Sequence, residues 1–212
     1  MYERLHAHFG ARDWWPGDSP FEIMVGAILT QNTNWKNVER AIDNLKRVGL
    51  LSLSAMSELS QDLLAEYIRP AGYYNIKAGR LRNFFHFINK EWDGDLDSFL
   101  QQPAAALREQ LLSIKGIGPE TADSMVLYAA GQPIFVVDAY THRILIRHEI
   151  IDESFGYHEI QELFMDNLEE DTLLFNEYHA LIVQVGKVYC KKSKPDCSHC
   201  PLAGLNGVER QQ

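Results

Sequence analysis

The sequence is short of positive charge and of long apolar runs. Its 212 residues carry 20 Lys and Arg against 29 Asp and Glu, a formal net charge of -9. This balance excludes a diffuse basic surface, so a polyanionic partner would have to meet a local positive patch. No stretch approaches the roughly 18 uncharged apolar residues of a membrane helix, and no basic segment followed by an apolar run opens the chain. We expect a soluble, cytoplasmic protein with no membrane partner.

Cysteine is scarce and confined to one place. The three cysteines, Cys190, Cys197 and Cys200, lie close together near the carboxyl end. A disulfide framework would spread its cysteines over a secreted domain. The clustering is instead typical of metal ligation.

Strand-like alternation is also scarce, whereas helical periodicity is found nearly everywhere. Helices are expected from Phe21, where Ser19 and Pro20 mark a start, and from Trp35. Further helical patterns cover 60–68, 75–90, 104–113, 119–130, 139–147, 158–167 and 172–189. The one β-like run, 133–138, is too isolated to build a sheet. With 46% hydrophobic residues the chain can bury a full core, and we expect an all-α fold.

A Gly-Ile-Gly turn joins two of these helical patterns within LLSIKGIGPETADSMVLYAAG, residues 111–131. Gly116 and Gly118 leave backbone N–H groups accessible beside the first turn of the next helix, which suits a phosphate. Ile117 would anchor the turn in the core. For DNA such a contact fixes the register of the strand without reading its sequence. The alternative is an ordinary αα-hairpin with a glycine cap.

An acid, Asp138, stands twenty residues past Gly118 and directly before the helical pattern 139–147. One interpretation is an N-cap, a common position for Asp. A capping residue also points its carboxylate outward at the end of a helix. A structural and a chemical role are therefore compatible at this position.

The turn and the spaced acid form LLSIKGIGPETADSMVLYAAGQPIFVVDAYTHRIL, which resembles the helix-hairpin-helix, Gly/Pro-rich loop and Asp signature of the endonuclease III superfamily of DNA glycosylases. PFEIMVGAILTQNTNW, AGYYNIKAGRL and CKKSKPDCSHCPL resemble other parts of that family, so the likeness runs from about Pro20 to Leu202. It implies a six-helix barrel over 20–132 and a second helical domain made of 1–19 with 133–212. Double-stranded DNA containing a damaged base would bind in a cleft between them, and we expect a monomer.

The resemblance assigns the chemistry to Asp138. Cleavage of an N-glycosidic bond develops oxocarbenium character on the sugar, which a carboxylate stabilises while it orients or activates a water. The base must first leave the stack, and Gln31 matches the family position that faces the vacated space; an exposed or capping glutamine is the alternative. The other DNA-binding residues are expected in the hairpin: Lys115, Gly116, Ile117, Gly118 and Thr121.

One position departs from the bifunctional members of the family. They carry a lysine in a pattern like G-x-G-x-K-T-A, and the matching string here is GIGPETA, with Glu120 in place of the lysine. An acid cannot form the Schiff base that leads to strand cleavage. The resemblance therefore implies a monofunctional glycosylase. Glu120 also has an ordinary use, because an acid in the first helical turn complements the helix dipole.

The expected base pocket is aromatic and consists of Trp14, Trp15, Pro16 and Trp35. Trp-Trp-Pro and Gln-Asn-Thr-x-aromatic segments resemble the 3-methyladenine glycosylase III branch of the superfamily. An electron-rich ring attracts the positive charge of an alkylated purine such as 3-methyladenine. The alternative is that these side chains simply cover a domain junction. Another lesion, such as an oxidised pyrimidine or a mismatch, and a non-catalytic DNA-binding module are the competing functions.

The cysteine loop, 190–206, has the C-x6-C-x2-C spacing of the family's iron-sulfur loop, but the fourth expected cysteine is Asn206. The resemblance implies a [4Fe-4S] cluster on Cys190, Cys197 and Cys200 with another group at the fourth iron. Zinc with help from His199 or His179, and a metal-free loop, are the alternatives. Four lysines near the first cysteine, which could form the local positive patch, are Lys187, Lys191, Lys192 and Lys194.

Overall fold

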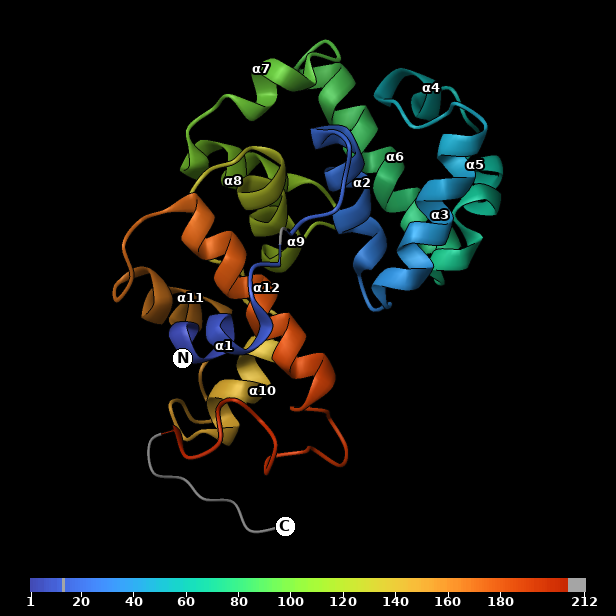
Figure 1. The fold of residues 1–212 in the computed structure, drawn as a ribbon. Helices are drawn as coiled ribbons and strands as arrows, with labels where there is room; N and C mark the ends of the chain where they lie inside the picture. Colours follow the sequence, from blue (N-terminus) through green and yellow to red (C-terminus); the bar gives the residue numbers. More distant parts are fainter. Residues whose placement is uncertain (13, 206–212) are drawn as a thin grey trace. The chain divides into compact units, whose positions relative to one another are not determined.

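The computed structural model describes residues 1–12 and 14–205 of the chain. Over these residues the chain forms twelve α-helices and two short helical turns, and no strand (Figure 1). The expected all-α class is confirmed. Within the same residues, no helix is both long enough and apolar enough to cross a membrane.

The chain divides into two compact units, Met1–Trp15 with Pro133–Gln212, and Pro16–Gln132. The second of these units holds the longer series of helices. In order they are α2 (Pro20–Thr30), α3 (Trp35–Arg47), α4 (Leu53–Ser57), α5 (Gln61–Tyr67), η1 (Arg69–Ala71), α6 (Tyr74–Glu91), α7 (Leu96–Leu100), α8 (Ala104–Ser113), α9 (Pro119–Ser124) and η2 (Met125–Ala129).

Most predicted helices lie within two residues of their expected bounds, but three helices were not predicted. They are α1 (Tyr2–Phe9), α4 and α7. The helices α4 and α7 have five residues each, less than two helical turns, so they show no hydrophobic period. Their starts are set by caps, because Ser52 Oγ accepts a hydrogen bond from the backbone of Ala55 and Asp95 Oδ1 accepts one from the backbone of Ser98.

The helix expected over 119–130 is divided. Regular α-helix α9 ends at Ser124 and continues as the π-helical turn η2, in which the N–H of Ala130 reaches the carbonyl of Met125. The β-like run that follows forms no regular secondary structure over 133–138. Its apolar side chains from Ile134 to Val137 are buried, which accounts for their character without a sheet.

The smaller unit is organised around the long helix α12 (Thr172–Val188), which packs against α1 and α10 (Ala139–Arg147). Its remaining helix is α11 (Tyr157–Met165). Phe135 stacks on Phe164 with a centroid distance of 3.9 Å and meets Phe175 edge-on. Helices α10 and α12 approach closely at Gly186, where an added Cβ would lie 2.3 Å from the ring of Tyr140.

A buried lysine in the core of the larger unit connects the end of α2 to the turn η1. Lys77 of α6 is 1% exposed, and its ammonium donates to the carbonyls of Leu29 at 2.7 Å and Ala71 at 2.8 Å. Leu29 lies in the last turn of α2, where carbonyls have no partner within the helix. Burial, with a smaller contribution from the charge of Arg80, lowers the pKa of Lys77 to about 8. Lys77 therefore joins the end of α2 to the turn η1.

We expect Lys77→Met to lower the free energy of unfolding by on the order of 2 kcal/mol, because two buried carbonyls lose their donor. Urea unfolding at pH 7 measures the effect. Lys36→Met, at an exposed position of α3, is the matched control and should change the value by less than about 0.5 kcal/mol. Equal effects of the two variants would contradict the role of Lys77.

Candidate active site

Asp138 occupies the N-cap of α10, so the capping interpretation is confirmed. Its Oδ1 accepts hydrogen bonds from the backbone N–H of Thr141 at 2.8 Å and from the Thr141 hydroxyl at 2.9 Å. The backbone N–H of Asp138 donates to the same hydroxyl at 3.5 Å, which completes a capping box. One oxygen of the carboxylate is therefore engaged by the end of the helix.

The other oxygen, Oδ2, faces His179 of α12. It lies 3.6 Å from Nε2 of that residue, and the side chains of Asp138 and His179 are only 10% and 7% exposed. Burial alone would raise the pKa of Asp138, but the contact and charge of His179, with the two Thr141 bonds, hold it below its ordinary value. Asp138 is thus an anion at neutral pH in a nearly buried position, where a fixed charge acts strongly on a developing cation.

The Gly-Ile-Gly turn forms a close contact with α6 in the larger unit. Gly116 has a φ of 100°, and a Cβ there would lie 2.5 Å from Cγ of Arg80, so both conformation and space require glycine. Ile117 is 5% exposed, in agreement with the expected anchor. Gly118 is the exposed N-cap of α9, and Pro119 fills the first helical position.

Gln31, the C-cap of α2, holds this turn from the other side. Its amide nitrogen donates to the carbonyl of Gly116 at 3.1 Å and to Oγ1 of Thr121 at 3.0 Å, and its carbonyl accepts from Arg80. Lys115 is tied to α6 through its backbone carbonyl, which accepts from an asparagine side chain. The structure thus brings Gln31, Gly116 and Thr121 together in one network. Their contact with DNA stays a prediction.

The expected aromatic pocket is distributed over both units. Trp14 and Trp15 belong to the smaller unit, whereas Pro16 and Trp35 belong to the larger one. Trp35 begins α3 and its indole N–H donates to Glu39 at 2.8 Å. The Lys187 ammonium lies 5.6 Å from the centroid of the Trp14 ring.

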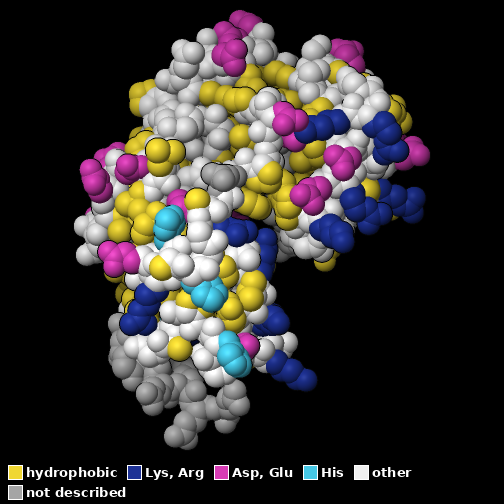
Figure 2. Space-filling view, viewed as in Figure 1, with side chains coloured by type: hydrophobic (Ala, Val, Ile, Leu, Met, Phe, Trp, Pro, Cys, Tyr) yellow, Lys and Arg dark blue, Asp and Glu magenta, His cyan; other side chains and the backbone are white. Residues whose placement is uncertain are grey.

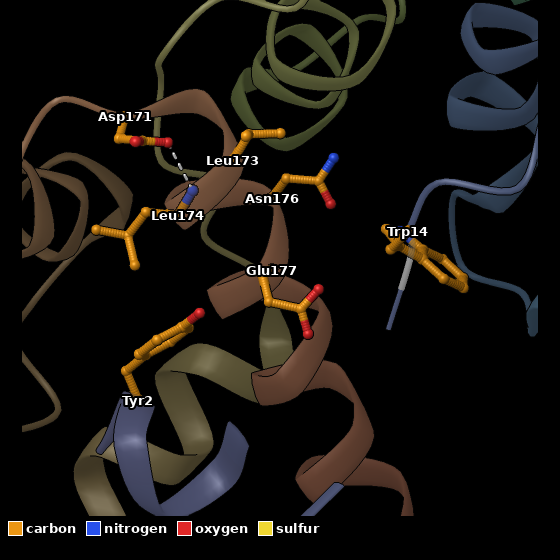
Figure 3. A pocket seen from close by; sticks show the side chains of 7 residues that line it. All are labelled: Tyr2, Trp14, Asp171, Leu173, Leu174, Asn176 and Glu177. Atoms are coloured by element: carbon orange, nitrogen blue, oxygen red, sulfur yellow. Dashed lines mark hydrogen bonds between the residues drawn. The ribbon is translucent and has the colours of Figure 1, made fainter. Parts of the chain in front are cut away.

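Trp14 also lines an open pocket of about 440 Å³ in the smaller unit (Figure 3). The other lining residues are Tyr2, Asp171, Leu173, Leu174, Asn176 and Glu177. Asp171 is engaged as the N-cap of α12 through the backbone of Leu174, and Glu177 accepts from the backbone of Arg12 at 2.8 and 3.1 Å. The two carboxylates therefore serve the local fold.

Two arginines one helical turn apart on α10 support the start of the cysteine loop. Arg143 Nε donates to the carbonyl of Cys190 at 2.8 Å. Arg147 donates to the sulfur of Cys190 at 3.2 Å and to the carbonyls of Lys191 at 2.6 Å and Lys192 at 3.1 Å. The nearby lysines are exposed, but acidic and basic side chains intermingle on the face shown in Figure 2.

The donors of this loop fit a four-thiolate cluster poorly. Within residues 1–12 and 14–205, no group of three or more His, Cys, Asp or Glu side chains is arranged to hold a metal ion. Burial raises the pKa of Cys200, which disfavours the thiolate that a metal requires. Asn206, at the fourth expected position, lies outside the described residues.

Comparison with known proteins identifies the family. The model of the HhH-GPD superfamily of base excision DNA repair proteins matches residues 25–170. The chain belongs to the HhH-GPD superfamily. It is 47% identical over 204 residues to "Putative DNA repair glycosylase MJ1434" of Methanocaldococcus jannaschii, covering 95% of this chain and 92% of the relative. This HhH-GPD chain is accordingly a DNA glycosylase of base excision repair, and the predicted resemblance to the endonuclease III superfamily is confirmed.

Two solved structures share the fold of this HhH-GPD chain. The crystal structure of H. pylori 3-methyladenine DNA glycosylase bound to 1,N6-ethenoadenine is 30% identical, with a TM-score of 0.75 over 88% of this chain and 96% of that one. A structure of endonuclease III trapped as a covalent intermediate with DNA is 21% identical, with a TM-score of 0.82 over 95% and 90%. The second likeness concerns the fold alone.

Sequence reasoning missed two contacts of the candidate site. It considered His179 only as a zinc ligand in one of the alternatives for the cysteine loop, and it did not consider Arg80 at all. A histidine on the apolar face of a predicted helix was a signal for His179, because a buried imidazole requires a polar partner. No signal in the sequence linked Arg80 to Gln31, since their contact depends on the packing of α6 beside the turn.

The depressed pKa of Asp138 predicts how stability depends on pH. A carboxyl with a folded pKa below its unfolded value of about 3.9 stabilises the fold above that value, and the contribution is lost as pH falls through the folded pKa. Urea unfolding of the native chain and of Asp138→Asn, from pH 7 down to 3, measures the difference. We expect it to persist to about pH 4 and to shrink below. If the stability difference between the two proteins were already lost at pH 5, the pKa of Asp138 would have to be raised in the folded protein.

We expect the cysteine loop to keep its fold without metal, because Arg143 and Arg147 support it. Treatment with a chelator should leave the thermal midpoint unchanged, whereas Arg147→Ala should lower it by about 3 °C, corresponding to roughly 1 kcal/mol of lost hydrogen bonding. Arg40→Ala, at an exposed position of α3, is the control. Bound iron with the visible absorbance of a cluster, together with unfolding by the chelator, would show that a cluster organises the loop.

Proposed function

We propose that this chain is a monofunctional DNA glycosylase that hydrolyses the N-glycosidic bond of a flipped alkylated purine such as 3-methyladenine. The observation that carries the proposal is the nearly buried, ionised carboxylate of Asp138 at the amino-terminal end of α10. Beside the anomeric carbon, this anion stabilises the oxocarbenium character of the sugar and orients the attacking water. The oxygen of the water bonds to the anomeric carbon, and the glycosidic bond breaks to release the base.

The absence of an amine at position 120, where the bifunctional members of the family carry their lysine, supports the monofunctional assignment. Glu120 lies in the first turn of α9, where its charge complements the helix dipole. The buried amine of Lys77 is engaged by two backbone carbonyls and serves the fold. Neither residue is therefore suited to attack the sugar and form an imine with it.

The choice of substrate rests on aromatic character and on a relative. Alkylated purines carry delocalised positive charge, which an aromatic face attracts. Lys187 already makes a contact of this kind with the Trp14 ring. The H. pylori 3-methyladenine glycosylase, 30% identical to this chain, was solved with a modified adenine. Because the glycosidic bond of such a base is weakened, flipping, stacking and one carboxylate suffice for the reaction.

The larger unit supplies contacts suited to the DNA strand. The exposed backbone at Gly116 and Gly118 beside the start of α9 suits a phosphate. Tyr73, the N-cap of α6, is 67% exposed and has a φ of 46°. We assign its ring to stacking on bases that lose their neighbour when the damaged base flips.

An assay with duplex oligonucleotides tests the function. Strands that carry single 3-methyladenine, hypoxanthine, uracil or oxidised-pyrimidine lesions are incubated with the enzyme and analysed with and without alkali. We expect release of the alkylated purine, strand breaks only after alkali, and no covalent adduct on borohydride treatment. Asp138→Asn, whose side-chain oxygen can still cap α10, should reduce the rate by about 100- to 1000-fold.

Asp95→Asn is the matched control, because Asp95 is also an N-cap aspartate but belongs to α7. It should leave base release unchanged. Preferential release of an oxidised pyrimidine would establish the alternative substrate. Release of no base from any lesion, with DNA binding retained, would establish a non-catalytic DNA-binding module.

A further inference from the structure

The carboxylate of Asp138 has two oxygens in different surroundings. Oδ1 accepts both hydrogen bonds from Thr141. Oδ2 receives none of these and faces Nε2 of His179, 3.6 Å away. Because Oδ1 is engaged by the helix end, Oδ2 is the oxygen available to the sugar or the water. The group that faces Oδ2 therefore acts on the reacting oxygen.

We propose that His179 is a positioning residue for base excision, which fixes Oδ2 of Asp138 in place. The inference rests on the proposed role of Asp138 and goes beyond it, because it concerns the helix behind the carboxylate. His179 is 5% exposed and lies on the face of α12 that packs on α10. A polar ring is expensive to bury without a polar partner, and Asp138 is such a partner. A side chain that served packing alone would be apolar here.

Two titratable groups of α10, Tyr140 and Arg143, follow Asp138 closely in the sequence and differ in their effect. Burial, and then the charge of Asp138, raises the pKa of Tyr140, so this ring stays neutral at physiological pH. Arg143 lies over the Tyr140 ring at 4.9 Å, and its Nε donates to the carbonyl of Cys190. Thr141 does not titrate. The imidazole of His179 is the group among these that meets Oδ2 directly.

The test replaces His179 in two ways. His179→Leu removes the polar ring, and His179→Gln keeps a neutral hydrogen-bond donor at the same position. His86→Gln, at an exposed position of α6, is the matched control. The titration of Asp138 is followed by the carbon-13 signal of its carboxyl group, assigned with Asp138→Asn. Base release from the alkylated duplex is measured from pH 4 to 8, and thermal unfolding reports on the fold.

We expect the pKa of Asp138 to rise in both variants, more in His179→Leu, because burial then acts with less opposition. The acid limb of kcat/KM should move to higher pH by the same amount. At pH 6 the rate in His179→Leu should fall on the order of 10- to 100-fold, the range found when a side chain that orients a metal ligand is removed. His179→Gln should retain more activity, and His86→Gln should match the native protein.

An unchanged titration of Asp138 in folded His179→Gln would overturn the proposal, since a residue that only fills the core would not move it. If His179→Leu does not fold, the glutamine variant still decides. The carboxyl titration needs no substrate. If the native enzyme releases no base, the proposed function fails, while the titration still shows whether His179 acts on Asp138.

Discussion

The constraint on which the site depends is the amino-terminal end of α10. Helix ends leave backbone N–H groups without partners, and Asp138 satisfies one of them through Oδ1. The same contact fixes the direction of the carboxylate and favours its anionic form. In the function we propose, Asp138 must be ionised and immobile for glycosidic chemistry, and the ordinary requirement of a helix end holds it so. The chemistry needs no separate scaffold, only a second contact on the remaining oxygen.

Local signals in the sequence predicted local structure. Ser19 and Pro20 marked the start of α2, and the position of Asp138 before an apolar helical pattern marked the start of α10. Glycine at 116 was linked to a turn, and its φ of 100° agrees. These features were predictable because each depends on a few consecutive residues. The short helices α4 and α7 were missed because five residues are too few to show a hydrophobic period.

Contacts between distant segments could not be read in this way. The network of Gln31 and Arg80 around the hairpin joins residues 49 positions apart, and Oδ2 of Asp138 meets His179 across two helices. Cysteine spacing suggested a metal but gave no sign of the arginines of α10 that support the start of that loop. A guanidinium bound to backbone carbonyls leaves no trace in spacing. The side chains that organise the site are therefore the ones that pattern analysis identifies least well.

The close approach of α10 and α12 at Gly186 bears on how such a site can change in evolution. Because the Tyr140 ring rests directly on the backbone at Gly186, a larger residue there would push the two helices apart. The carboxylate is carried by one helix and the imidazole by the other, so their separation is set by this aromatic contact. Positions 140 and 186 should therefore vary together among relatives that keep an acid at 138 and a histidine at 179. Relatives that lack this acid and histidine would no longer require a small residue at position 186.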